Sequence, residues 1–150
     1  MFLKEIEIQG FKSFADKTKV VFDRGVTAVV GPNGSGKSNI TESLRWTLGE
    51  SSVKSLRGGK MPDVIFAGTE TRKPLNYASV AVVLDNSDQF IKNATSEIQV
   101  ERHIYRSGDS EYKIDGKKVR LRDIHDLFMD TGIGRDSVSY THLTLPTILR

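Results

Sequence analysis

Eight residues near the start of the chain have the composition of a phosphate-binding loop. Gly31–Ser38 reads GPNGSGKS, which fits the pattern G-x-x-x-x-G-K-[ST]. Gly34 and Gly36 permit backbone angles and a close approach that a β-carbon would obstruct, so backbone N–H groups can converge on phosphate oxygens. Lys37 is expected to reach the β- and γ-phosphates of ATP, and the Ser38 hydroxyl is expected to bind Mg²⁺, which prefers oxygen ligands. The predicted nucleotide-binding residues of this segment are Gly31, Pro32, Asn33, Gly34, Ser35, Gly36, Lys37, Ser38 and Asn39.

The neighbouring sequence supplies the strand and the helix that such a loop needs. Val26–Val30 (VTAVV) is nearly all apolar and β-branched, which is typical of a strand buried on both faces. Ile40, Leu44 and Leu48 recur at spacings of four and predict a helix over Lys37–Leu48, with Gly49 as its stop. Strand, loop and helix in this order are the context that the motif requires. A Gly/Ser-rich surface turn that matches the pattern by chance is therefore the weaker reading.

The rest of the chain is predicted to be rich in strands. Period-two alternation or β-branched runs indicate strands around Ile6 and Ile8, and at Lys19–Phe22, Ala78–Leu84 and Ile98–Tyr105. Asp115-Gly116, between Glu111–Ile114 and Lys118–Leu121, is a strong signal for a tight hairpin. Apolar residues at helical spacing predict a helix over Leu121–Met129. The long stretch Glu50–Lys73 has weak periodicity, which in a compact domain indicates a functional or mobile loop.

Composition excludes several classes of protein. A chain of 150 residues with 37% hydrophobic content indicates one globular domain or part of one. Its apolar runs are too short to span a bilayer, and its N-terminus lacks a secretory signal, so no membrane association is expected. The absence of cysteine excludes disulfides and thiolate metal sites and is compatible with a reducing cytosol. A net charge of +3 permits an acidic partner such as DNA without arguing for one.

Several longer stretches resemble one family. These are GFKSFADKT at Gly10–Thr18, GPNGSGKSNI at Gly31–Ile40, RWTLGE at Arg45–Glu50, SLRGGKMPDVIFAGT at Ser55–Thr69, VLDNSD at Val83–Asp88, and the run from Tyr105 to Ser137. Over residues 1–137 the chain resembles the N-terminal head lobe of SMC (structural maintenance of chromosomes) proteins, most closely the bacterial chromosome-partition type. The series of matches is far more specific than a P-loop alone.

The resemblance implies a fold, an assembly of the head from two lobes, and an activity of the complete protein. The fold class would be α/β, a P-loop NTPase of the ABC type, with an antiparallel β portion beside the P-loop core in an incomplete domain. A C-terminal lobe would complete the head, and two heads of a homodimer would enclose two ATP molecules. The complete protein would hydrolyse ATP to drive DNA compaction and chromosome segregation, with kleisin-type subunits as partners. It would lie in the cytoplasm, associated with the nucleoid.

Three residues outside the P-loop resemble family positions near the nucleotide. Lys12 and Ser13, in GFKSF, match such positions, although an exposed turn after a strand would also explain them. Arg57, in SLRGG, resembles an arginine loop that reaches toward the phosphates, and the resemblance implies that it assists catalysis; a solvated loop arginine is the alternative. Phe66 is interpreted as a packing residue, and Trp46 as a core or lobe contact. His103 and His125 lack partners at metal-ligand spacing and receive no role.

Lys118, Arg120 and Arg122 alternate in the sequence and are expected along one strand face. A solvated face is the usual meaning of such a row, and contact with DNA phosphates is the alternative.

The chain departs from the family pattern after Ser137. No glutamine loop follows, and the final stretch Val138–Arg150 has no acidic residue. We therefore assign residues 1–137 to the head lobe and interpret residues 138–150 as a non-native, artefactual tail. The signature motif and Walker B carboxylates are also missing from the sequence, so this fragment alone is expected to be inactive as an ATPase.

Other functions remain as alternatives. A repair ATPase of the RecF or RecN type shares the motif, but SLRGGKMPDVIFAG and YRSGDSEY favour the chromosome protein. A P-loop kinase or GTPase is disfavoured because no N-K-x-D pattern is present. A non-enzymatic alternative is a nucleotide-binding fragment without turnover.

Overall fold

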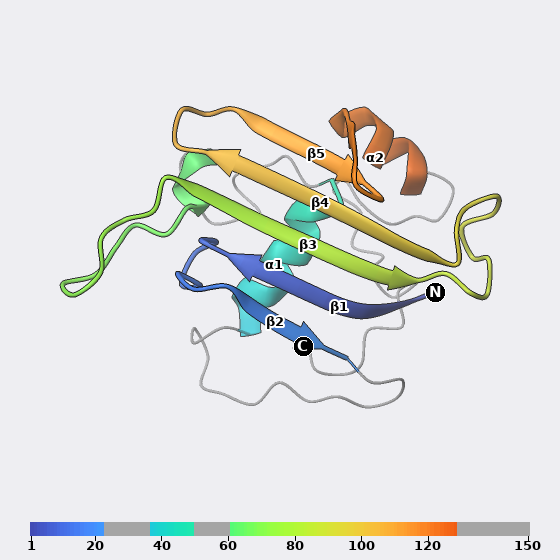
Figure 1. Cartoon of the computed structure of the whole chain (residues 1–150), viewed down its shortest axis with the longest axis horizontal. Coiled ribbons are helices and arrows are strands. Elements are labelled where there is room, and N and C mark those ends of the chain that lie inside the picture. The colour runs from blue at the N-terminus through green and yellow to red at the C-terminus, as the bar shows by residue number, and fades with distance from the viewer. Residues whose placement is uncertain (23–36, 50–60, 129–150) are drawn as a thin grey trace.

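A six-stranded antiparallel sheet dominates the computed structural model, which describes residues 1–22, 37–49 and 61–128 (Figure 1). The strand order is β2-β1-β3-β4-β5-β6. The strands are β1 (Phe2–Gln9), β2 (Thr18–Val21), β3 (Tyr77–Asp85), β4 (Glu97–Tyr105), β5 (Ser110–Ile114) and β6 (Lys117–Val119). The helices are α1 (Lys37–Thr47), the short 3-10 helix η1 (Met61–Val64) and α2 (Leu121–Phe128). The antiparallel β portion that the sequence predicts is thus present.

Helix α1 crosses one face of the sheet and makes its main contacts with β3 and β4 (Figure 1). Alternate residues of both strands are buried on this face, as period-two patterning predicts. The buried apolar side chains are Ala78, Val80, Val82 and Leu84 on β3, Ile98, Val100 and Ile104 on β4, and Ile40 and Leu44 on α1. The core is therefore sandwiched between the sheet and α1, and α1 is fixed by hydrophobic burial.

A register shift in β1 keeps its apolar residues on the core face. Leu3, Ile6 and Ile8 are all fully buried, although Leu3 and Ile6 would point to opposite faces of a regular strand. The pairing of β1 with β3 shifts between Leu3 and Glu5, which inserts one residue and reverses the alternation. A β-bulge thus reconciles the sequence spacing with a one-sided core.

The hairpin predicted at Asp115-Gly116 is confirmed. Both residues have a left-handed backbone, with φ of 51° and 83°, as a type I′ turn requires. The expected strand over Lys118–Leu121 is wrong at its end, because β6 stops at Val119 and α2 begins at Leu121. The Arg120 backbone N–H donates to Asp123 Oδ2 at 2.8 Å. This bond at the start of α2 is half of a capping box, and it lowers the pKa of the Asp123 carboxyl.

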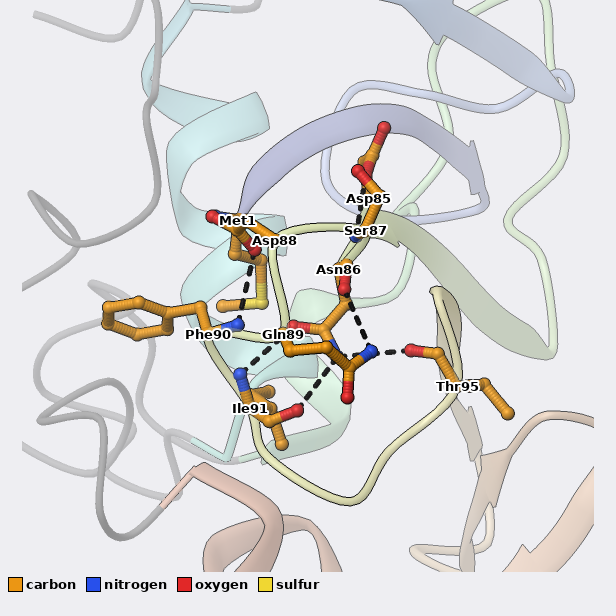
Figure 2. Close-up of polar contacts among 9 residues, drawn as sticks. All are labelled: Met1, Asp85, Asn86, Ser87, Asp88, Gln89, Phe90, Ile91 and Thr95. Atoms are coloured by element: carbon orange, nitrogen blue, oxygen red, sulfur yellow. Dashed lines mark hydrogen bonds and ion pairs between the residues drawn. The ribbon is translucent and has the colours of Figure 1, made fainter.

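The connection between β3 and β4 is organised by a buried asparagine (Figure 2). Asn86 donates from Nδ2 to the carbonyls of Ile91 and Thr95, at 2.9 and 3.0 Å, and accepts from the Ile91 N–H at 2.9 Å. The amino group of Met1 forms an ion pair with Asp88 in the same connection. This contact lowers the pKa of the Asp88 carboxyl. The start of β1 is thereby held against the β3–β4 turn.

In the part of the chain that the structure describes, no helix is both long and apolar enough to cross a membrane.

Candidate nucleotide-binding site

Helix α1 begins at Lys37, immediately after the last glycine of the P-loop motif. The predicted helix over Lys37–Leu48 is confirmed to within one residue. Its first turn contains no acidic residue, and Arg45 lies in its last turn. The partial positive charge of a helix N-terminus favours an anion there. Because no carboxylate lies in the first turn of α1, no acidic side chain of that turn opposes a bound anion.

Residues 10–14 form the loop that carries Lys12, here called the Lys12 loop, and backbone hydrogen bonds hold it on both sides. Gly10 donates to the Phe14 carbonyl at 2.5 Å and accepts from the Phe66 N–H at 2.7 Å. The Lys12 N–H donates to the Val64 carbonyl at 2.6 Å, so the last residue of η1 and the segment that follows it hold this turn in place. Lys12 itself has a φ of 54°, an uncommon conformation for a non-glycine residue. The surrounding hydrogen bonds therefore hold the Lys12 backbone in this conformation and set the direction of its side chain.

The Lys12 side chain points toward α1. Its Nζ lies 3.7 Å from Oε2 of Glu42, and the two side chains are 19% and 7% exposed. Glu42 lies in the second turn of α1, so the structure brings Lys12 to the helix that follows the P-loop. A carboxylate in this position would repel phosphate, and the neighbouring ammonium offsets that charge. Ser13 lies in the same turn and is exposed.

Aromatic packing joins the Lys12 loop to α1. Phe11 and Trp46 are both fully buried, with ring centroids 5.3 Å apart and planes inclined at 45°. Tilted aromatic pairs of this separation are favourable beyond the area that they bury. Trp46 is therefore a core residue, as expected, and Phe66 is also buried, as its interpretation as a packing residue predicts.

Other predicted site residues lie outside the described residues. These are Gly31, Pro32, Asn33, Gly34, Ser35, Gly36 and Arg57, as well as the strand expected at Val26–Val30. Lys37, Ser38 and Asn39 form the first turn of α1, but their side chains are outside the described part. Their roles remain predictions.

The residues that the structure describes are compatible with a bound phosphate group. A helix N-terminus without carboxylates in its first turn suits phosphate, and Lys12 lies beside the same helix. Across residues 1–22, 37–49 and 61–128, no cluster of three or more His, Cys, Asp or Glu could hold a metal ion.

The basic residues Lys118, Arg120 and Arg122, at and after edge strand β6, differ from their predicted arrangement. Arg120 lies between β6 and α2, and Arg122 lies on α2, so Lys118, Arg120 and Arg122 do not share one strand face. Lys118 and Arg120 instead line an open groove of about 680 Å³, together with Tyr105 and Tyr112. Lys118 pairs with Glu111 at 3.4 Å and Arg120 pairs with Asp123 at 3.6 Å. Both basic side chains are more than two-thirds exposed, so these pairs are weak.

Three features define the N-terminal lobe of an ABC-type ATPase head. They are the antiparallel sheet, the helix after the P-loop motif and the Lys12 loop. The chain belongs to the family described as the RecF/RecN/SMC N terminal domain, whose sequence profile matches residues 2–148. The resemblance to bacterial SMC proteins is confirmed. The chromosome partition protein Smc of Clostridium kluyveri is 63% identical over 139 residues, and that of Bacillus subtilis is 58% identical over 139 residues.

Each of these alignments covers 93% of this chain but 12% of the relative. The chain therefore spans about one-eighth of the length of the curated relatives it matches.

Solved structures give the same assignment. One, from work on ATP-driven dimerization and DNA-stimulated activation of SMC ATPases, superposes with a TM-score of 0.84 at 34% identity, covering 92% of this chain and 84% of that chain. An Smc head bound to the C-winged helix domain of ScpA gives 0.83 at 35% identity, covering 89% and 41%. RecF with ATP is more distant, at 0.59 and 28% identity, covering 79% and 28%. The predicted fold class is confirmed, and the SMC type is favoured over RecF.

Proposed function

We propose that this chain binds ATP with Mg²⁺ as the N-terminal half of an SMC head, and that the completed head hydrolyses ATP to drive DNA compaction and chromosome segregation. The observation that carries the proposal is the motif Gly31–Ser38, which runs directly into the first turn of α1. Its backbone N–H groups would bind phosphate oxygens, Lys37 would bind the β- and γ-phosphates, and Ser38 would bind Mg²⁺. These groups hold and orient the nucleotide.

Lys12 supports the same site from the neighbouring loop. Its ammonium lies beside α1 and offsets the charge of Glu42, so that this carboxylate would repel the bound phosphates less. Ser13 and Arg57 are proposed to approach the nucleotide on the family resemblance. Arg57 would stabilise charge that develops during hydrolysis.

The catalytic groups are proposed to come from other parts of the complete protein. Hydrolysis needs a positioned water, a base and full magnesium coordination. A C-terminal lobe and a second head of a homodimer would supply them. A kleisin-type subunit is a further proposed partner, because a solved Smc head is described as bound to part of ScpA. We place the complete protein in the cytoplasm with the nucleoid, assign residues 1–137 to the lobe, and retain the artefact hypothesis for residues 138–150.

DNA is proposed to contact the groove beside β6 and α2. Lys118 and Arg120 line this groove, and because both basic side chains are exposed, their partners Glu111 and Asp123 hold them only weakly. Phosphates of a duplex could replace those carboxylates, with Arg122 adding a third charge from α2. Replacing Arg120 or Arg122 by alanine should lower affinity for a short duplex and reduce its salt dependence by about one ion per residue. Unchanged affinity and salt dependence in both variants would exclude this surface.

The division of catalysis between lobes has a direct test. The chain should release no phosphate from ATP above a Lys37→Ala control. Addition of the C-terminal lobe of the Bacillus subtilis relative should give magnesium-dependent release, and Lys37→Ala should abolish it. Turnover by the chain alone would contradict the split site and would direct attention to its own carboxylates, first Glu42, Glu50, Asp63 and Asp85.

A further inference from the structure

Arg102 occupies a position on β4 where the strand pattern calls for an apolar side chain. Its neighbours on the core face, Ile98, Val100 and Ile104, are buried aliphatic residues, and Arg102 is only 2% exposed. Placing a guanidinium in a core is costly unless other groups compensate its charge and hydrogen bonds. Arg102 must therefore make favourable contacts there.

The guanidinium lies between two aromatic rings and a helix end. Its Nη1 donates to the Trp46 carbonyl at 2.8 Å. Its Cζ lies 4.6 Å from the centroid of the Trp46 ring and 5.1 Å from that of Tyr112, which is paired with Arg102 across β4 and β5. Both rings are within the range of cation–π attraction, and the planar guanidinium suits this stacking better than an ammonium.

The hydrogen bond fixes the C-terminal end of α1. Trp46 is the penultimate residue of this helix, and carbonyls in the last turn have no partner within the helix. A cation at that end also interacts favourably with the helix dipole. Because α1 is one continuous helix, anchoring Trp46 also determines the position of Lys37, about 14 Å away at 1.5 Å per residue.

The same guanidinium supports the Lys12 loop. Trp46 contacts Arg102 and also packs against Phe11, the residue before Lys12. Two parts of the proposed phosphate site, the first turn of α1 and the Lys12 loop, therefore depend on the position of one tryptophan. Arg102 is a polar group that connects that tryptophan to the sheet.

We propose that Arg102 is a positioning residue for nucleotide binding: from β4 it sets the placement of α1 and of the Lys12 loop, and so aligns the groups that bind phosphate. This inference rests on the proposed function, since it assumes that the P-loop binds ATP. Arg102 acts through Trp46 and Phe11 and does not itself touch the nucleotide. A displacement of about 1 Å at binding groups can lower affinity or rate strongly, so loss of this anchor should be measurable.

The test compares Arg102→Met with Gly116→Ala in the unsubstituted 150-residue background. Gly116 lies in the tight turn between β5 and β6, where an added β-carbon would meet nothing within 4 Å, so its replacement is a destabilising control that acts only through the left-handed backbone. Calorimetry with Mg-ATP is carried out well below the melting temperature of each variant. Circular dichroism checks the fold, and Trp46 emission reports removal of the stacked cation.

Arg102→Met should bind ATP about tenfold more weakly with shifted Trp46 emission, while Gly116→Ala binds normally despite its lower melting temperature. If Arg102→Met does not fold, Arg102→Lys decides: it keeps the charge but not the planar stacking, and should bind ATP more weakly than the control variant.

Unchanged ATP affinity in the folded Arg102 variants would overturn the positioning role, and so would an equal loss in Gly116→Ala. Failure of the unsubstituted chain to bind ATP would instead overturn the proposed function, and this inference with it.

Discussion

Replacement of Gly10 by alanine should destabilise the chain much more than the same replacement at Gly116. Both glycines have left-handed backbones, with φ of 71° and 83°, so both alanine variants carry the cost of that conformation, about 1 kcal/mol. The surroundings differ. A β-carbon at Gly116 would meet nothing within 4 Å, whereas one at Gly10 would lie 2.3 Å from the Tyr77 carbonyl oxygen. Gly116 is therefore a matched control for the packing around Gly10.

The contact at Gly10 cannot be relieved by rotating a side chain. Tyr77 begins β3, and Gly10 is held by backbone hydrogen bonds to Phe14 and Phe66, so relief requires movement of the backbone. Overpacking of this kind costs about 1–3 kcal/mol. We expect a loss of about 1 kcal/mol for Gly116→Ala and about 2–4 kcal/mol for Gly10→Ala.

Urea unfolding followed by the emission of Trp46, the single tryptophan, measures both losses. Losses that agree within about 0.5 kcal/mol would refute the argument that close packing fixes the loop that carries Lys12.

Three further substitutions test other parts of the account. Asn86→Ala removes three side-chain hydrogen bonds in a buried turn and should cost about 2–4 kcal/mol in urea unfolding; a loss below about 1 kcal/mol would contradict the organising role of Asn86. The pKa of Asp123 is lowered mainly by the Arg120 N–H, so its stabilisation is complete above the unfolded pKa, near 3.9, and is lost as pH falls through the lower folded pKa. Unfolding at pH 7 and pH 2 should show a smaller acid-induced loss in Asp123→Ala than in the unsubstituted chain, and an equal loss would exclude the cap. Arg57→Ala in a completed head should lower ATP turnover without changing the melting temperature. Normal turnover would mean that Arg57 is a solvated loop residue with no role in hydrolysis.

Local sequence patterns predicted the elements that depend on local chemistry. Asp115-Gly116 specified its turn because the left-handed backbone suits these residue types, and Ile40 and Leu44 specified α1 because one helical face is buried. The β-bulge after Leu3 was not predicted, since it arises from pairing with β3 across a long separation in sequence. The start of α2 at Leu121 was predicted correctly, but the strand before it was extended too far, because the Asp123 cap at Arg120 ends β6 at Val119.

The residues that support the candidate site were harder to predict from the sequence. Lys12 was predicted from family resemblance, but its contact with Glu42 depends on how a loop after β1 packs against α1. Arg102 was not predicted at all, although a signal existed: a cation interrupts the apolar alternation of Ile98, Val100 and Ile104. Its partners, Trp46 and Tyr112, come from α1 and β5, so only tertiary structure reveals what compensates the buried charge.

The central claim is that Gly31–Ser38 binds the phosphates of ATP, and calorimetry with Mg-ATP tests it most directly. The measurement compares the unsubstituted chain with Lys37→Ala and with Lys92→Ala, which removes an exposed lysine from the β3–β4 connection. A hydrogen bond to a charged group contributes about 1.5–3 kcal/mol, so Lys37→Ala should weaken binding about 10- to 150-fold or abolish it, while Lys92→Ala binds normally. Equal ATP affinity in folded Lys37→Ala and in the unsubstituted chain, or no binding by any of the three, would contradict the account.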